Sequence, residues 1–324
     1  MAENKAEKMA TRQAYGKTLV ELGKTTPNLV VMDADLSKST MTAEFGKAYP
    51  ERFFNMGIAE QNLYGTACGL ALSGKVVCAS TFAMFAAGRA FEIIRNSIGY
   101  THANVKICAT HAGITVGEDG ASHQTFEDIA LMRTIPGMTV LNPSDGVSAR
   151  ALIKQAVAFD GPAYIRLGRA AVPTFYTEEM AVKLEIGKGV CLRTGDKKDG
   201  KPADATVIAT GIMVNEAMLA AEELAANGIE VRVIDMHTIK PLDADIIYRA
   251  ARETGAIVTA EEHSVIGGLG SAVAEVTATH YPVKMAMVGQ QDTFGESGKP
   301  DELKAKYGMT AADIVRAVKL LIEA

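Results

Sequence analysis

The sequence predicts an α/β fold of two domains, each a mostly parallel sheet covered by helices. The chain has 324 residues, about twice what one ordinary hydrophobic core needs. Short apolar runs, such as residues 28–33 and 75–80, alternate with segments of helical periodicity. This alternation is typical of parallel strands with crossover helices. The composition shifts after residue 172, where the first domain is expected to end.

The first domain is expected to cover residues 1–172. A helix over 10–24 precedes the first buried strand, and a helix rich in small residues follows over 59–72. A long helix is expected from Phe82 to Ile98, and Ser144 is a plausible N-cap for a helix over 145–158. Further strands are expected at 104–110 and 163–167.

The second domain is expected to cover residues 189–324, after a linker over 173–188. The polar, glycine-rich stretch 193–201 is interpreted as the tip of a surface hairpin. The remaining pattern predicts strands at 205–211, 229–234, 256–260 and 283–288, with helices over 214–227 and 310–323.

Charge and cysteine usage exclude several classes of protein. The formal net charge is −5, from 33 basic and 38 acidic side chains, so no basic surface indicates nucleic-acid binding. The four cysteines lie far apart without a CxxC pair, which argues against a zinc site and a disulfide framework. No apolar run reaches the length of a membrane span, and the polar start at Met1 resembles neither a signal peptide nor a truncation. A cytoplasmic protein is expected.

Two glycine-rich or apolar segments favour structural roles. The turn Gly267-Gly-Leu-Gly-Ser resembles a phosphate-binding GxG turn, but close packing of a helix on its sheet is the favoured interpretation. Residues 213–224 are expected to form an ordinary amphipathic face rather than a cofactor site.

Glu60 is the first candidate for chemistry. It follows a short strand at the start of the 59–72 helix, where an acid can simply complement the helix dipole. Its neighbours Ile58, Ala59, Leu63 and Gly65 are expected to exclude water and raise the pKa of the carboxyl group. Such a carboxyl group suits proton exchange with a nitrogen heterocycle.

Two further segments add aromatic and polar groups. Phe82 and Phe85 are expected on one helical face, either as core or as a stacking platform for a flat ring. The loop from His111 to His123 follows a predicted strand and carries two histidines, Glu118 and Asp119. Core packing does not require these residue types, so the loop is interpreted as a ligand-binding loop at the carboxyl end of a parallel strand.

Together, GIAE, TFxxF, HAGxTxGEDGxxHQ and the following PSD resemble transketolase, a thiamine-diphosphate enzyme of sugar-phosphate metabolism. The resemblance covers essentially the whole chain and implies a pyrimidine-binding domain followed by a transketolase C-terminal domain. It implies that Glu60 bonds the aminopyrimidine ring of the cofactor and relays the activating proton. Phe82 and Phe85 correspond to the aromatic wall, although Gly88 replaces an expected third aromatic residue. Asp35 and Ile58 correspond to further residues of the cofactor pocket.

The resemblance also implies a sugar-phosphate site. His123 corresponds to a histidine near the ketose carbonyl, and Asp119 to an acid that contacts a substrate hydroxyl. His111 is expected to act with His123 in catalysis and to help hold the phosphate. Three more residues complete the expected phosphate-binding set: Arg12, Ser39 and Arg169.

One expected motif is missing from the sequence. The family holds the cofactor diphosphate through Mg²⁺ bound by a GDG motif and a later Asn, and this sequence has no such pair. No metal ligand is therefore expected in this chain. The resemblance implies the C-terminal subunit of a split transketolase, with Mg²⁺ ligated by an N-terminal partner. A heterotetramer with active sites at the subunit interfaces would bury the 59–72 helix.

Three alternatives differ in specific residues. 1-Deoxyxylulose-5-phosphate synthase shares the IAEQ segment, but His111 and Glu118 favour transketolase. The beta subunit of a 2-oxo-acid dehydrogenase would lack the sugar-phosphate set. A noncatalytic binding module is disfavoured because Glu60, Asp119 and His123 are all present.

Overall fold

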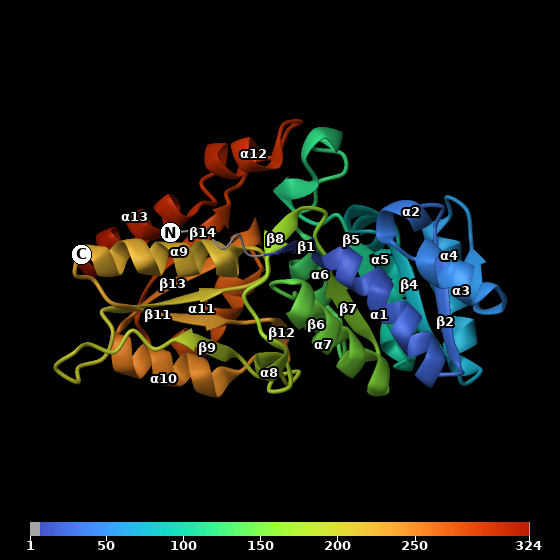
Figure 1. Ribbon diagram of the computed structural model, residues 1–324, viewed down its shortest axis with the longest axis horizontal. Coiled ribbons are helices and arrows are strands. Elements are labelled where there is room, and N and C mark those ends of the chain that lie inside the picture. The colour runs from blue at the N-terminus through green and yellow to red at the C-terminus, as the bar shows by residue number, and fades with distance from the viewer. Residues whose placement is uncertain (1–6, 324) are drawn as a thin grey trace.

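The computed structural model describes residues 7–323 and contains two α/β lobes side by side (Figure 1). The first lobe is built on a seven-stranded sheet with the order β12-β6-β7-β5-β4-β2-β3. The second is built on a five-stranded sheet with the order β14-β13-β10-β11-β9. All pairings inside both sheets are parallel except those of β12 and β9. The predicted fold class is confirmed.

The strands of the first sheet are rich in apolar residues because helices cover both of its faces. They are β2 (Leu29–Asp33), β3 (Phe53–Asn55), β4 (Val76–Phe82), β5 (Val105–Thr110), β6 (Thr139–Leu141) and β7 (Ala163–Arg166). One face packs on α1 (Thr11–Thr25) and α7 (Gly146–Ala158), with Tyr15 and Leu152 in the core. The other face packs on α4 (Glu60–Leu72) and α6 (Asp128–Thr134). Short helices α2 (Ser37–Thr40) and α3 (Ala43–Ala48) follow β2.

The second sheet is covered in the same way. Its strands are β9 (Val190–Arg193), β10 (Ala205–Ala209), β11 (Val231–Asp235), β13 (Ala256–Ser264) and β14 (Lys284–Gln290). Helices α9 (Met213–Ala226) and α13 (Ala311–Glu323) pack on one face. Helices α10 (Ala244–Thr254) and α11 (Leu269–His280) pack on the other, and α12 (Pro300–Lys306) lies near the first lobe (Figure 1).

The segment after β11 of the second lobe contributes one strand to the sheet of the first lobe. Strand β12 (Thr238–Lys240) follows β11 of the second lobe but pairs antiparallel with β6 of the first. Near the chain start, β1 (Lys8–Ala10) pairs antiparallel with β8 (Ala171–Pro173), and α8 (Glu178–Ala181) follows. Strand β12 is not predictable from the sequence, because three residues carry too little pattern to show their pairing partner. The domain boundaries 1–172 and 189–324, with a linker over 173–188, remain predictions.

Three local predictions are wrong. Asp145, not Ser144, caps α7, because its side chain accepts the Ser148 N–H at 2.8 Å. Residues 193–201 do not form a hairpin tip, because β9 pairs with β11 at the sheet edge while the next strand, β10, is central.

The predicted 82–98 helix is also different in detail. Phe82 is the last residue of β4, and the following helical segment contains two π-helical stretches, η2 (Phe85–Arg89) and η3 (Ile94–Gly99), around α5 (Phe91–Ile93). A π-helical turn accommodates an extra residue and re-aims the side chains around it. Phe82 and Phe85 therefore do not share a helical face, and their proximity comes from the turn out of β4.

Among residues 7–323, no helix is both long and apolar enough to span a bilayer. Residues 1–6, which belong to the polar N-terminal stretch considered above, lie outside the described part of the chain.

Candidate functional site

The candidate residues gather at one edge of the first sheet. Strands β2, β4 and β5 are parallel and adjacent, so the residues that follow them emerge at the same edge. Phe82 ends β4, and His111 directly follows β5 with a left-handed backbone at φ 59°. Arg169 follows β7, and Arg12 lies in the first turn of α1. This edge is where open α/β sheets bind ligands.

Glu60 is the first residue of α4, and its side chain is only 2% exposed. Both carboxylate oxygens accept hydrogen bonds of 2.9 Å from Nη1 of Arg89. The predicted burial is correct, but its expected cause is partly wrong. Leu63 is fully buried, whereas Ile58 is 78% exposed and a Cβ added at Gly65 would meet open space. Helix α4, which Glu60 begins, packs instead on β4 and on the segment after it, where Ala83, Ala86 and Ala87 are buried.

The aromatic rings lie together with both loop histidines. The rings of Phe82 and Phe85 are 5.9 Å apart and 15° from parallel, and the His111 ring stacks on Phe82 at 3.9 Å. The His123 ring meets Phe85 edge-on at 5.4 Å. The structure therefore brings together these four rings from β4, the following turn and the 111–123 loop.

The predicted phosphate-binding residues also converge. Nη1 of Arg12 donates to the Ser39 carbonyl oxygen at 2.6 Å, which joins α1 to α2. Burial, together with the nearby charges of Arg12, Arg169 and His123, lowers the pKa of His111 to about 3. His111 is therefore neutral at pH 7, and its Nδ1 lies 2.9 Å from the Thr110 hydroxyl. Burial lowers the pKa of Arg12, and the nearby positive charge of Arg169 lowers it further.

Arg169 is linked to the loop that carries Asp119. Its Nη1 donates to the Val116 carbonyl oxygen at 2.7 Å and to the Glu118 carboxylate at 2.8 Å. The side chain of Arg169 is 35% exposed and that of Glu118 is 60% exposed, so a bound anion could replace the Glu118 contact. Asp119 is exposed beside them.

Asp35 and Ile58 are less closely joined to this group. Asp35 is exposed at φ 64°, and its carboxylate accepts from Asn55 Nδ2 at 3.1 Å. Ile58 directs most of its side chain to solvent. Among residues 7–323, neither residue makes a hydrogen bond or a ring contact with the aromatic rings or the histidines.

Sequence reasoning missed two residues that organise this edge. Arg89 holds Glu60, and its Cζ lies 4.5 Å from the Phe85 ring centroid. Asp33 is fully buried and accepts from the Leu36 N–H and the hydroxyls of Thr40 and Thr42. Burial raises the pKa of Asp33 to about 6 against these hydrogen bonds. A sequence signal existed for Asp33, since it ends an otherwise apolar strand, whereas nothing local distinguished Arg89.

The residues present fit one end of thiamine diphosphate. A buried carboxylate that shares the contact of Arg89 with one of two stacked phenyl rings is suited to a flat, polar nitrogen heterocycle. No group of three or more His, Cys, Asp or Glu side chains between residues 7 and 323 is arranged to hold a metal ion.

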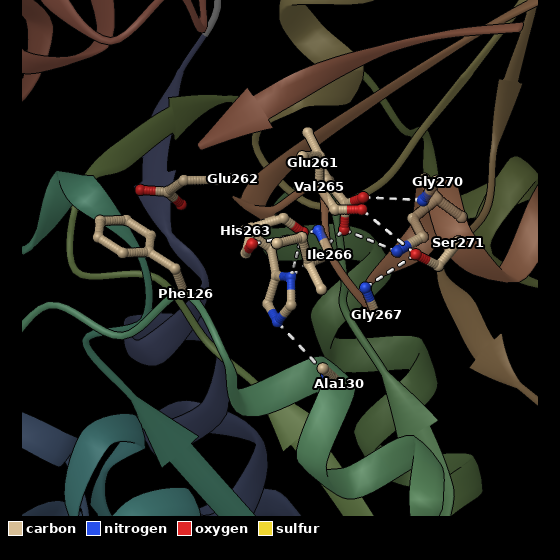
Figure 2. A network of polar contacts seen from close by, with 12 residues as sticks. Phe126, Ala130, Glu261, Glu262, His263, Val265, Ile266, Gly267, Gly270 and Ser271 are labelled. Carbon is tan, nitrogen blue, oxygen red and sulfur yellow. Dashed lines mark hydrogen bonds and ion pairs between the residues drawn. The ribbon is translucent and has the colours of Figure 1, made fainter. Parts of the chain in front are cut away.

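The GGLGS turn does not form part of the site. Glu261 accepts the N–H groups of Leu269 and Gly270 at 2.7 and 2.8 Å, so a carboxylate of the chain itself occupies the N-terminus of α11 (Figure 2). A Cβ at Gly268 would overlap Glu261, and one at Gly267 would lie 2.7 Å from the Ala130 Cβ. The close-packing interpretation is confirmed.

The fold and this edge define a two-domain α/β protein whose candidate site lies at one edge of the first sheet. Family models for the transketolase pyrimidine-binding domain and the transketolase C-terminal domain match residues 7–174 and 197–314. The chain therefore belongs to the transketolase family.

Individual relatives agree with this assignment. A putative transketolase C-terminal section from Methanocaldococcus jannaschii is 51% identical, over 95% of this chain and 94% of the relative. A 6-deoxy-6-sulfo-D-fructose transketolase subunit from a Clostridium species is 42% identical, over 99% of this chain and 97% of the relative. A solved structure described as an inactive beta4 tetramer of a split-gene transketolase superposes with a TM-score of 0.88 at 55% identity, covering 97% of this chain and 99% of that one.

Proposed function

We propose that this chain is the C-terminal subunit of a split transketolase, which moves a two-carbon ketol unit from a ketose phosphate to an aldose phosphate. The relatives described as a C-terminal section, a subunit and a split-gene protein have nearly the same length as this chain, and they support the division into two subunits. The observation that carries the proposal is the buried Glu60, joined through Arg89 to the Phe82–Phe85 pair, together with a cluster of arginines and histidines on the same rings.

When bound, thiamine diphosphate supplies the carbon nucleophile for this chemistry. Glu60 would hold the proton at the pyrimidine ring nitrogen, and Phe82 and Phe85 would hold the ring in place. The N-terminal subunit would bind the diphosphate through Mg²⁺. These assignments leave Asp35 and Ile58 as residues at the rim of the cofactor pocket.

The polar side of the site would bind the sugar phosphate. Arg12, Arg169, His111 and Ser39 would hold the phosphate, while His123 and Asp119 would contact the carbonyl and hydroxyl groups. His111, neutral in the free site, can take up a proton beside an anion because negative charge favours the imidazolium form. At the phosphate end of the substrate, Arg12 and Arg169 would supply paired N–H donors that fit a phosphate group.

The site would be completed at an interface between subunits. Helix α4 has an exposed face on which a Cβ at Gly65 or Gly69 would meet open space, and Leu72 is 64% exposed. A smooth face of small residues next to Glu60 permits close approach of another chain. The description of the split-gene relative as an inactive tetramer of one subunit type fits a chain that needs its partner for activity. Two copies of each subunit would make a heterotetramer, and a cytoplasmic location is expected for it.

The test is a calorimetric titration of thiamine diphosphate and Mg²⁺ into this chain mixed with its N-terminal subunit. Binding that is lost in Glu60→Ala, followed by ketol transfer from xylulose 5-phosphate, would support the proposal. A complex that binds no cofactor would identify a noncatalytic module. Preference for pyruvate over the pentose phosphate would move the protein to the synthase or dehydrogenase alternatives.

A further inference from the structure

Strand β13 of the second lobe reaches the loop that begins at His111. Near its end, just before Ser264, lie Glu261, Glu262 and His263, which are all buried although titratable. Successive side chains of a strand point in opposite directions. Glu261 is directed to the start of α11, while Glu262 is directed away from it, toward the side of Phe126 (Figure 2).

Glu262 contacts the loop at its centre. Its Oε1 accepts the backbone N–H of Thr115 at 2.7 Å, although the two residues are 147 positions apart. Thr115 lies in η4 (Ile114–Asp119), between His111 and Asp119. Gly113 lies at φ 79°, and a Cβ there would overlap the carboxyl group of Glu262. The loop sequence therefore leaves room for this particular side chain.

The first lobe holds Glu262 from its other side. Arg166, at the end of β7, donates through Nη2 to the Glu262 carbonyl oxygen at 2.8 Å, and its Nη1 lies 4.0 Å from the Glu262 carboxylate. Arg166 is itself fixed by a 2.8 Å bond from Nε to the buried Asp128, which also accepts from the Tyr164 hydroxyl at 2.7 Å. Burial raises the pKa of Glu262, while Arg166 and the Thr115 N–H oppose that rise.

The neighbouring histidine is fixed as well. His263 accepts the Ala130 N–H at Nε2, at 3.3 Å, and its Nδ1 lies 2.8 Å from the Ser264 carbonyl oxygen (Figure 2). The carboxylates of Asp128 and Glu261 lie 3.9 and 3.7 Å from its two ring nitrogens. The polar side chains near the end of β13 are therefore held by defined hydrogen bonds.

A second contact holds the far end of the loop. Nε2 of Gln124 donates to the Glu296 carbonyl oxygen of the second lobe at 2.9 Å and to the Ile114 carbonyl oxygen at 3.3 Å. The Ser264 N–H donates to the Phe126 carbonyl oxygen at 2.9 Å. In Figure 1 the loop lies beside the segment that leads into α12. The second lobe thus contacts the loop at its middle and at its end.

We infer that Glu262 is a positioning residue of the substrate site: through the Thr115 N–H it fixes the loop that carries His111, Asp119 and His123. The second lobe then contributes to catalysis without touching the substrate. The inference concerns how the loop is held, and it rests on the proposed function only for the consequence in ketol transfer.

Hydrogen–deuterium exchange of the chain measures the first part directly. In Glu262→Ala the amides of 113–118 should exchange at least about tenfold faster, because the buried acceptor is gone and the loop opens more often. Glu262→Gln keeps an oxygen acceptor without the charge, so a smaller acceleration is expected. Amides of α7 should not change in either variant. Asp243→Ala is the matched control, because Asp243 is another mostly buried carboxylate that accepts backbone N–H groups, from Gly189 and Ile246, remote from the loop.

Unchanged exchange at 113–118 in a folded Glu262→Ala chain would overturn the inference. If that variant does not fold, unchanged loop exchange in Glu262→Gln would overturn it equally. Acceleration of the loop in Asp243→Ala to the same extent would show general destabilisation and also overturn it.

Kinetics of the complex with the N-terminal subunit test the consequence. Glu262→Gln should raise KM for the phosphorylated donor by about three- to tenfold while cofactor affinity stays unchanged, since Glu60 and Phe82 lie on other elements. A fall in kcat alone, with KM unchanged, would indicate a loss of folded enzyme and contradict the positioning role. If the unmodified complex shows no ketol transfer, the proposed function fails while the exchange result still decides how the loop is held.

Discussion

Nη1 of Arg89 bonds both carboxylate oxygens of Glu60 at 2.9 Å, while the guanidinium carbon lies 4.5 Å from the centre of the Phe85 ring. The planar guanidinium group of Arg89 therefore contacts both the buried Glu60 and the Phe85 ring. The proposed function assigns these same two contacts to the cofactor. Arg89 is half exposed, so its side chain has room to leave. Cofactor binding is therefore expected to displace Arg89 from Glu60.

Replacement of Arg89 by Ala should tighten cofactor binding in the assembled enzyme. The gain should be about two- to fivefold in Kd, because a half-exposed ion pair contributes only about 0.2–1 kcal/mol. Arg89→Lys, which keeps the charge but not the flat group, should lie between Ala and the unmodified chain. Calorimetric titration with thiamine diphosphate measures the effect. Weaker binding in Arg89→Ala would mean that Arg89 supports the cofactor and does not compete with it.

Replacement of Glu60 by Gln should lower the rate of ketol transfer by roughly 10²–10⁴, the usual range for a general acid–base residue. The fold should persist, since a helix-dipole role alone involves about 0.3–1 kcal/mol. The specific measurement is hydrogen–deuterium exchange at the thiazolium carbon of the bound cofactor. Near-normal exchange in Glu60→Gln or Glu60→Ala would remove Glu60 from cofactor activation.

Arg169 should discriminate phosphorylated donors from others. Arg169→Ala should raise KM for xylulose 5-phosphate by an amount equivalent to about 1.5–3 kcal/mol, the range for a hydrogen bond to a charged group. Hydroxypyruvate, which has no phosphate, should be much less affected. Because Arg169 also bonds the Val116 carbonyl oxygen, equal losses on both donors would assign it a structural role in the loop.

The stability of the folded chain should decrease as the pH rises, because of Asp235, the last residue of β11. This buried carboxylate accepts from the hydroxyls of Ser144 in the first lobe and Tyr176, which lies between β8 and α8. Burial raises the pKa of Asp235 to about 7, against these hydrogen bonds. The folded chain therefore binds more protons than the unfolded chain between about pH 4 and pH 7.

The contribution of Asp235 to the free energy of unfolding should fall across that window, by an amount on the order of 2–4 kcal/mol. Asp235→Asn should remove that slope, as measured by urea unfolding at several pH values. A matched control is Asp196→Asn, because Asp196 is 56% exposed. An unchanged slope in Asp235→Asn would show that Asp235 is not the titrating group.

The main strands were predictable because β2, β4 and β5 are mostly apolar segments, buried along their whole length. Most of the predicted site residues also came together, since parallel neighbours end at one edge, whereas Asp35 and Ile58 did not join them. Strand β12 was not predictable, because its partner β6 lies about a hundred residues earlier and its three residues carry no distinctive pattern. The break between Phe82 and the following helix depends on π-helical turns, which leave no simple periodicity.

The contacts that tie the site together were beyond the sequence pattern for a physical reason. Arg89 and Glu60 are 29 positions apart, and Glu262 and Thr115 are 147 apart. Only the packing of α4 against η2, and of the second lobe against the first, brings these partners together. The PSD motif at residues 143–145 also acquires its contacts only from the fold. Ser144 bonds Asp235, 91 positions away, and Asp145 caps α7.

The central claim is that this chain supplies half of an active site that a second chain completes. The most direct measurement is the initial rate of ketol transfer at a fixed amount of this chain, saturating thiamine diphosphate and Mg²⁺, as the N-terminal subunit is added. We expect no turnover by the chain alone, and a rate that rises with added partner to a plateau at one partner per chain. Turnover by the pure chain, or no turnover at any ratio, would contradict the account.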